Sequence, residues 1–208
     1  EIIMKNILTL ALLLVATMAL AQNVETQVNN NGGVEPLVIK VWPNGAPNSN
    51  GATQENPASR GQKWDFEATL TVFPAAEPNG LAVLCCPGGG YFMLSNTHEG
   101  RDFYTYFNER GITYAMLEYR MPGGHKEVPL SDAQEAMRIM NAHAKEWGIK
   151  KLGIMGTSAG GHLASTVATH YTDDATKPAF QILFYPLISM DETITHDGSR
   201  LFLIGKEP

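Results

Sequence analysis

The sequence of 208 residues contains only two cysteines, Cys85 and Cys86, which are adjacent. Neighbouring cysteines cannot form a disulfide of ordinary geometry without a strained ring, so we expect two buried free thiols. They fall in a predicted strand, where successive side chains point to opposite faces of the sheet. No Cys or His pair has metal-ligand spacing supported by a second pair, so the sequence predicts no metal site.

Basic residues are also scarce, since 15 Lys and Arg stand against 21 Asp and Glu, for a net charge of -6. Without a basic stripe to follow a phosphate backbone, we expect no nucleic-acid partner. The 20 Gly and 12 Pro are scattered, which excludes collagen-like and linker sequences. The apolar share of 44% is enough for a buried core, and the length fits one domain.

A long hydrophobic run is missing as well. The apolar stretch at residues 7–20 is shorter than the roughly 20 residues that cross a bilayer. It follows Lys5 and ends in Ala19-Leu20-Ala21, the pattern of a secretory signal peptide cleaved after Ala21. We therefore predict a signal peptide at residues 1–21, a flexible polar lead-in at 22–35, and export to the periplasm or beyond the cell without stable membrane insertion.

After the lead-in, two opening strands are followed by strands that alternate with helices. The second opening strand alternates apolar and polar residues from Phe66 to Val72, the pattern of a half-exposed strand. A helix is predicted to begin at Ser131, with Gln134 completing a capping box, and to end at Gly148. The later strands are expected at residues 81–86, 112–117, 151–155 and 180–185. This alternation predicts an α/β fold with a mostly parallel sheet covered by helices on both faces.

Ligands of such sheets bind at the carboxyl ends of the strands, and a Gly-Thr-Ser-Ala-Gly motif occurs at that place. Ser158 follows an apolar strand and opens a helix, the setting of a nucleophile elbow. Gly156 and Gly160 permit the sharp turn because a side chain at either position would collide with a neighbouring strand or helix. A purely structural turn is the alternative.

A second glycine motif follows the strand at residues 81–86. Pro87-Gly88-Gly89-Gly90-Tyr91 would let the backbone approach a substrate and turn its amides toward it. Such amides, with that of Ala159 after the serine, are the donors that an oxyanion hole requires. A flexible turn is the alternative, but two such motifs at the ends of the expected strands favour a catalytic site.

The two motifs, PGGGY and GTSAGGHLA, resemble the α/β-hydrolase superfamily, in particular its esterase and lipase branch. The similarity extends to secreted bacterial acetyl xylan esterase-like proteins and covers most of residues 81–200. It implies an α/β-hydrolase fold, with Ser158 as nucleophile and the amides of Gly89, Gly90 and Ala159 as oxyanion hole. Pro87 stands where the branch usually has His, which removes that residue's hydrogen bonds to the loop.

The resemblance also implies a triad in the order Ser, acid, His, with the acid commonly after the seventh strand and the His after the eighth. Because residues 180–185 are only the sixth strand, we expect both beyond residue 208 and the hydrolase domain at 36–208 to lack its last strands. Asp191 with His196 is the alternative acid and base. His162 is predicted to pack under the elbow, and Glu99 to cap a helix or, with His98, to contact a leaving group.

These observations together predict a secreted serine esterase that acts on acylated carbohydrate through an acyl-enzyme and needs no cofactor. Its partner would be an acylated small molecule or polysaccharide. Two alternatives remain open. One is a serine peptidase of the prolyl-oligopeptidase type, which has the same elbow, and the other is a non-catalytic binding module on a hydrolase scaffold.

Overall fold

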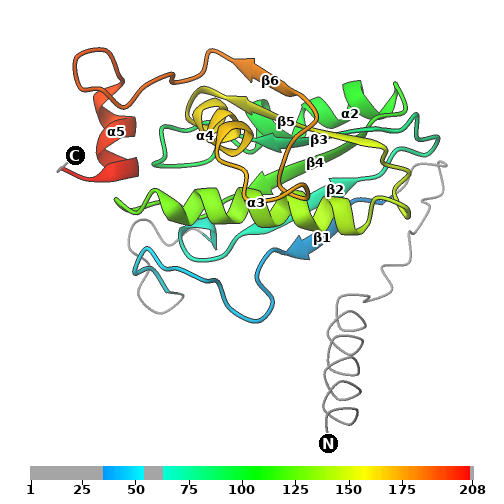
Figure 1. Cartoon of the computed structure of the whole chain (residues 1–208), viewed down its shortest axis with the longest axis horizontal. Coiled ribbons are helices and arrows are strands. Elements are labelled where there is room, and N and C mark those ends of the chain that lie inside the picture. The colour runs from blue at the N-terminus through cyan, green and yellow to red at the C-terminus, as the bar shows by residue number, and fades with distance from the viewer. Residues whose placement is uncertain (1–34, 54–62, 207–208) are drawn as a thin grey trace, which may run out of the picture.

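Six strands form one sheet in the described part of the chain, in the spatial order β1-β2-β4-β3-β5-β6 (Figure 1). The computed structural model describes residues 35–53 and 63–206. The predicted signal peptide, 1–21, and residues 22–34 of the predicted lead-in lie outside the described residues. The strands are β1 (Leu37–Lys40), β2 (Thr69–Phe73), β3 (Leu81–Cys86), β4 (Thr113–Glu118), β5 (Lys151–Thr157) and β6 (Gln181–Phe184).

The sheet is mostly parallel, which confirms the predicted α/β fold. Strands β4, β3, β5 and β6 run parallel, whereas β2 runs antiparallel to both of its neighbours, β1 and β4, near one edge of the sheet. Parallel neighbours need crossover connections, and helices supply them here. The helices are the short η1 (Lys63–Asp65), the π-helical turn η2 (Thr97–Arg101), α2 (Phe103–Asn108), α3 (Glu127–Ala142), α4 (Ser158–Thr169) and α5 (Asp197–Ile204).

The sheet separates two apolar cores, as predicted for a sheet covered on both faces. The larger core lies between the sheet and helices α3 and α4, and the smaller core lies under α2 (Figure 1). Cys85 belongs to the smaller core and Cys86 to the larger, because consecutive strand residues point to opposite faces. Both thiols are free and buried, which confirms the interpretation made from their spacing.

Strand β2 is buried on both faces, so the prediction of a half-exposed strand is wrong. The polar residues Thr69 and Thr71 are buried together with their apolar neighbours. Strand β2 lies between β1 and β4, and the Thr69 hydroxyl donates a 2.6 Å hydrogen bond to Glu118 Oε2. A threonine whose hydroxyl is hydrogen-bonded in this way can be buried. The alternation of apolar and polar residues therefore did not indicate an exposed face of the strand.

Helix α3 begins at Glu127, one turn before the predicted start at Ser131. Pro129 fits there because the amide of a first-turn residue has no partner within the helix. Ser131 does not cap the helix, since its hydroxyl donates to the Val128 carbonyl oxygen at 2.8 Å. A serine within a helix can form this backward bond as readily as an N-terminal cap, so the capping pattern misplaced the start.

The same helix ends at Ala142 and not at the predicted Gly148. His143 leaves the helical region with φ -94° and ψ 12°, and residues 143–148 form irregular turns that end at Gly148 with φ 64°. The apolar residues Ala133, Ala136, Met137 and Met140 are all buried and lie on one face of α3.

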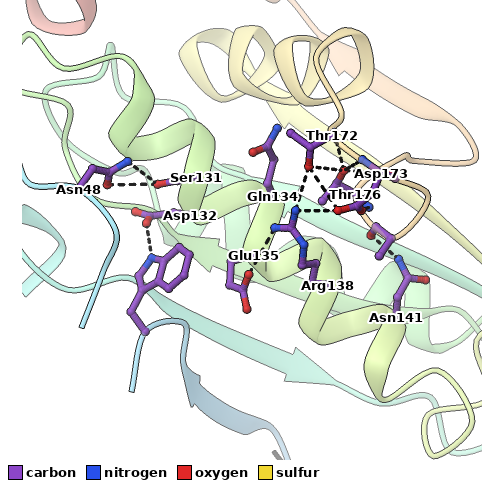
Figure 2. A network of polar contacts seen from close by, with 12 residues as sticks. Asn48, Ser131, Asp132, Gln134, Glu135, Arg138, Asn141, Thr172, Asp173 and Thr176 are labelled. Atoms are coloured by element: carbon purple, nitrogen blue, oxygen red, sulfur yellow. Dashed lines mark hydrogen bonds and ion pairs between the residues drawn. The ribbon is translucent and has the colours of Figure 1, made fainter. Parts of the chain in front are cut away.

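Polar contacts fix α3 between two loops (Figure 2). On one side, Asn48 Nδ2 donates to Ser131 Oγ at 3.0 Å. On the other side, Arg138 donates to Thr172 Oγ1 at 2.9 Å and to Asp173 Oδ2 at 3.0 Å. These bonds hold the helix that packs against α4, and α4 begins at Ser158.

Candidate active site

Ser158 lies at the junction of β5 and α4 with φ 50°, a left-handed backbone conformation that is strained for serine. A Cβ at Gly160 would run into the carbonyl oxygens of Cys86 and Pro87, and one at Gly156 would run into the carbonyl oxygen of Gly160. Both glycines are therefore required for the reason predicted from the sequence. The strand-to-helix turn at residues 156–160, which we call the elbow, has the backbone form of a nucleophile elbow.

The loop at residues 87–91, which we call the glycine loop, runs beside the elbow. A Cβ at Gly88 would lie 3.1 Å from the Cβ of Ser158 and 2.8 Å from the Thr157 carbonyl oxygen. Gly89 and Gly90 have φ 134° and 66°. The two motifs found separately in the sequence therefore meet at the carboxyl ends of the adjacent strands β3 and β5.

Three amides at this meeting point have no acceptor among the described residues. They belong to Gly89, Gly90 and Ala159. The amide of Ala159 lies in the first turn of α4, where backbone donors have no partner within the helix. Unpaired donors beside a nucleophile are what an oxyanion hole requires, so the arrangement is able to bind a developing negative charge.

Two tyrosines brace the glycine loop, and sequence reasoning assigned neither of them. The Tyr119 hydroxyl donates to the Pro87 carbonyl oxygen at 2.8 Å, and the rings of Tyr91 and Tyr119 meet edge to face at 6.2 Å. Tyr91 has φ 59°, an uncommon value for a residue other than glycine. The bond from Tyr119 supports the loop at the residue where the resembled proteins usually carry His.

His162 is half-buried on α4, as expected of a packing residue, and contacts Tyr91 of the glycine loop. Its Nδ1 lies 2.8 Å from the Tyr91 hydroxyl, and the two rings meet edge to face at 5.9 Å. Burial lowers the pKa of His162 and raises the pKa of Tyr91 well above its ordinary value. Both groups are therefore neutral near pH 7, and the contact is a hydrogen bond between uncharged groups.

Glu99 bonds both motifs, which corrects its predicted role as a helix cap. Its Oε2 accepts hydrogen bonds from the Gly88 amide at 2.9 Å and from Thr157 Oγ1 at 2.8 Å. Its Oε1 accepts from the Tyr185 hydroxyl at 2.9 Å, and this bond raises the pKa of Tyr185. His98, predicted as a possible partner at the leaving group, is exposed and lies 3.3 Å from Asp102 Oδ2.

No described residue forms a hydrogen bond with the hydroxyl of Ser158. Asp191 Oδ1 instead accepts from the amide and the hydroxyl of Thr193, at 2.9 and 2.7 Å. His196 caps α5 through bonds to Ser199. The structure therefore does not join Asp191 and His196 into an acid and base pair for Ser158.

The loop after β6 adds a further wall at the elbow. The amide of Leu187 donates to the Ser158 carbonyl oxygen at 3.2 Å, and Tyr185 has φ 36°. Helix α5 reaches the glycine-loop side, where Phe92 and Phe202 have ring centroids 4.6 Å apart. Three separate parts of the chain thus lie around the elbow: the glycine loop with Phe92, the loop after β6, and α5.

Within residues 35–53 and 63–206, no group of three or more His, Cys, Asp or Glu is arranged to hold a metal ion. The helices of those same ranges are each too short or too polar to cross a membrane. The elbow presents the Ser158 hydroxyl beside the backbone amides of Gly89, Gly90 and Ala159.

A protein family described as alpha/beta hydrolase fold matches residues 83–204, which include both glycine motifs. The chain is 44% identical over 145 residues to an acetylxylan esterase of Xylanibacter ruminicola, covering 69% of this chain and 30% of that protein. It is 35% identical over 142 residues to endo-1,4-beta-xylanase B of Butyrivibrio fibrisolvens, covering 61% of this chain and 22% of that protein. The chain thus spans less than a third of the length of these curated relatives.

Among solved structures, the chain is similar to an acetyl ester-xyloside bifunctional hydrolase from Caldicellulosiruptor lactoaceticus. The TM-score is 0.65 and the identity 29%, over 83% of this chain and 64% of that one. The match extends beyond the two glycine motifs to most of the sheet and its helices.

Proposed function

The chain belongs to the alpha/beta hydrolase fold family, and from that premise we propose that it is a serine esterase that removes acetyl groups from acylated carbohydrate such as xylan. Two comparisons support this substrate class. One relative is named an acetylxylan esterase, and the similar solved structure is named an acetyl ester-xyloside hydrolase. The serine peptidase considered from the sequence has no such support.

The observation that carries the proposal is the position of Ser158 beside three unpaired amides. In the proposed reaction, Ser158 Oγ attacks the ester carbonyl carbon and loses its proton to a general base. The carbonyl oxygen becomes an oxyanion, which the amides of Gly89, Gly90 and Ala159 stabilise. Expulsion of the sugar hydroxyl, which takes up the proton, leaves an acyl group on Ser158.

Water then completes the reaction. The same base removes a proton from water, the resulting nucleophile attacks the acyl carbonyl, and a carboxylic acid leaves while Ser158 regains its proton. We propose that this base is a histidine held by an acid, as the family resemblance implies. No cofactor takes part in this scheme.

We propose further that the protein is exported. The support is the sequence of residues 1–21, with Lys5, an apolar run and Ala19-Leu20-Ala21, which has the three regions of a signal peptide. Export would bring the enzyme to polysaccharide outside the cytoplasm. Identification of the N-terminus of the exported protein by mass spectrometry should give Gln22 as first residue, and an exported protein that retains residues before Gln22 would contradict this part of the proposal.

The test of the activity uses the full-length gene product. We expect hydrolysis of p-nitrophenyl acetate and release of acetate from acetylated xylan, both reduced at least about a thousandfold in Ser158→Ala. Ser165→Ala, on the same helix, is the matched control and should hydrolyse both substrates at the wild-type rate. Xylan binding without serine-dependent hydrolysis would contradict the esterase and favour the binding module.

A further inference from the structure

We propose that Glu99 is a positioning residue that fixes the glycine loop against the elbow, so that the amides of Gly89 and Gly90 stand at the correct distance from Ser158. This inference deepens the proposed esterase function and rests on it. It assigns no direct contact between Glu99 and the substrate.

The bonds around Glu99 form a closed triangle. The Gly88 amide donates both to Glu99 Oε2 and to Thr157 Oγ1, at 2.9 Å each, and the Thr157 hydroxyl donates to the same Oε2 at 2.8 Å. Gly88 immediately precedes Gly89, and Thr157 immediately precedes Ser158. The triangle therefore joins the residue before the first proposed oxyanion donor to the residue before the nucleophile.

The second carboxylate oxygen is also held. Glu99 Oε1 accepts from the Tyr185 hydroxyl at 2.9 Å, so a third segment of chain fixes the orientation of the carboxylate. All three groups donate, and an ionised carboxylate is the side-chain group that only accepts. A Cβ at Gly88 would run into Oε2, which shows how closely the carboxylate lies against the loop backbone.

This arrangement matters for the reaction because oxyanion donors act over a narrow range of distance. They must lie about 2.7–3.1 Å from the place the oxyanion will occupy, and a misplacement of about 1 Å can lower the rate by about a hundredfold. A negative charge near the loop would not itself favour an oxyanion. We therefore assign the contribution of Glu99 to geometry, which a neutral group of the same shape can supply.

The substitution Glu99→Gln replaces the carboxylate by a neutral amide of nearly the same shape. Its carbonyl oxygen can accept from Gly88 and Thr157, while its amide group can donate to the Tyr185 hydroxyl oxygen. Glu99→Ala removes all three bonds. Glu109→Ala, at the exposed C-terminal end of α2, is the matched control for loss of a surface carboxylate.

The experiment compares these variants of the full-length gene product with p-nitrophenyl acetate. We expect Glu99→Ala to lower kcat by about tenfold to a hundredfold with KM changed less than about twofold. Its affinity for a trifluoromethyl ketone, whose adduct with Ser158 carries an oxyanion, should fall by a similar factor. Glu99→Gln should recover activity to within about threefold of wild type, and Glu109→Ala should match wild type.

Two results would overturn the inference. A wild-type kcat in Glu99→Ala would remove any role in positioning, and equal losses in Glu99→Gln and Glu99→Ala would assign the effect to the charge. A wild-type protein without Ser158-dependent hydrolysis would instead contradict the proposed function. In that case the ¹H–¹⁵N resonances of the glycine loop test whether Glu99 positions it. The signals of Gly88, Gly89 and Gly90 should shift in Glu99→Ala and stay unchanged in Glu109→Ala. Unchanged signals in Glu99→Ala would refute the positioning role.

Discussion

The Tyr91 hydroxyl lies 2.8 Å from His162 Nδ1, and this contact joins the glycine loop to the helix that begins at Ser158. Tyr91 is almost fully buried and holds φ 59°, so its neighbours must stabilise the conformation. The glycine loop is thus fixed by three contacts: Tyr91 with His162, Pro87 with Tyr119, and Gly88 with Glu99.

Tyr91→Phe should lower the free energy of unfolding by about 1–3 kcal/mol, because it leaves a partly buried nitrogen of His162 without its hydrogen bond. The measurement is chemical denaturation of the purified protein. Tyr104→Phe is the control, since the ring of Tyr104 stacks on Phe73 and its hydroxyl bonds no described residue. Equal stability of Tyr91→Phe and wild type would show that the contact contributes nothing.

The stability should also depend on pH through His162. Burial holds the pKa of His162 below 6.5 in the folded state, so between that pKa and 6.5 the unfolded chain binds more protons. The free energy of unfolding should therefore fall as the pH is lowered from 6.5 toward the folded pKa of His162, and its contribution should be complete above 6.5. Denaturation curves from about pH 7.5 to about pH 5 test this, and His162→Gln should show a shallower slope. An identical slope in the two proteins would refute it.

What the sequence could predict here was local. The serine motif, the triple glycine and the alternation of strands with helices are each readable within a few residues, and the structure brings the two motifs together beside Ser158. Gly156 and Gly160 could be assigned to the turn because the collision that a side chain would cause follows from the elbow geometry itself.

The bracing contacts could not be predicted, because they join residues far apart in sequence. Glu99 reaches Thr157 across 58 positions, and Tyr91 reaches His162 across 71. No periodicity in the sequence identifies such a distant partner. Glu99, next to His98, was therefore interpreted from its local sequence, as a helix cap or a contact to a leaving group. The start of α3 was misplaced for another reason, since the Ser131 hydroxyl donates back to the Val128 carbonyl oxygen and also accepts a bond from the distant Asn48, and neither bond caps the helix.

The two cysteines should be inert to thiol reagents in the folded protein. Burial raises the pKa of Cys85 to about 12 and that of Cys86 well above its ordinary value, so neither is a thiolate near pH 8. Titration with Ellman's reagent should give no reaction in the native state and two thiols in concentrated guanidinium chloride. Reaction of either thiol in the native protein would contradict the burial of both.

Two aspartates on or beside α3 should differ in their effect on stability. Asp132 is fully buried, accepts from Arg120 at 2.6 Å and also accepts from Trp42 Nε1 at 2.6 Å. Asp132→Ala should lower the free energy of unfolding by about 3–5 kcal/mol, because it leaves the buried Arg120 charge uncompensated.

Asp173→Ala is the matched control, since Asp173 pairs with Arg138 at 3.0 Å on the surface, where solvent and salt screen the charges (Figure 2). It should unfold close to wild type, and the small difference should shrink further in added salt. Losses of equal size in the two variants, measured by urea denaturation, would contradict the assignment of the stabilisation to the buried pair.

The strain at Ser158 can be measured by relieving it. Glycine adopts φ 50° without the steric penalty of a Cβ, whereas alanine keeps the penalty and removes only the hydroxyl. Ser158→Gly should therefore be more stable than Ser158→Ala by about 1 kcal/mol, even though glycine also gives the unfolded chain more freedom. Both variants should lose Ser158-dependent hydrolysis equally, so activity and stability separate at this residue. If Ser158→Gly proves no more stable than Ser158→Ala in thermal and urea denaturation, the elbow holds its conformation without strain, and φ alone is a poor guide to the energy stored beside the nucleophile.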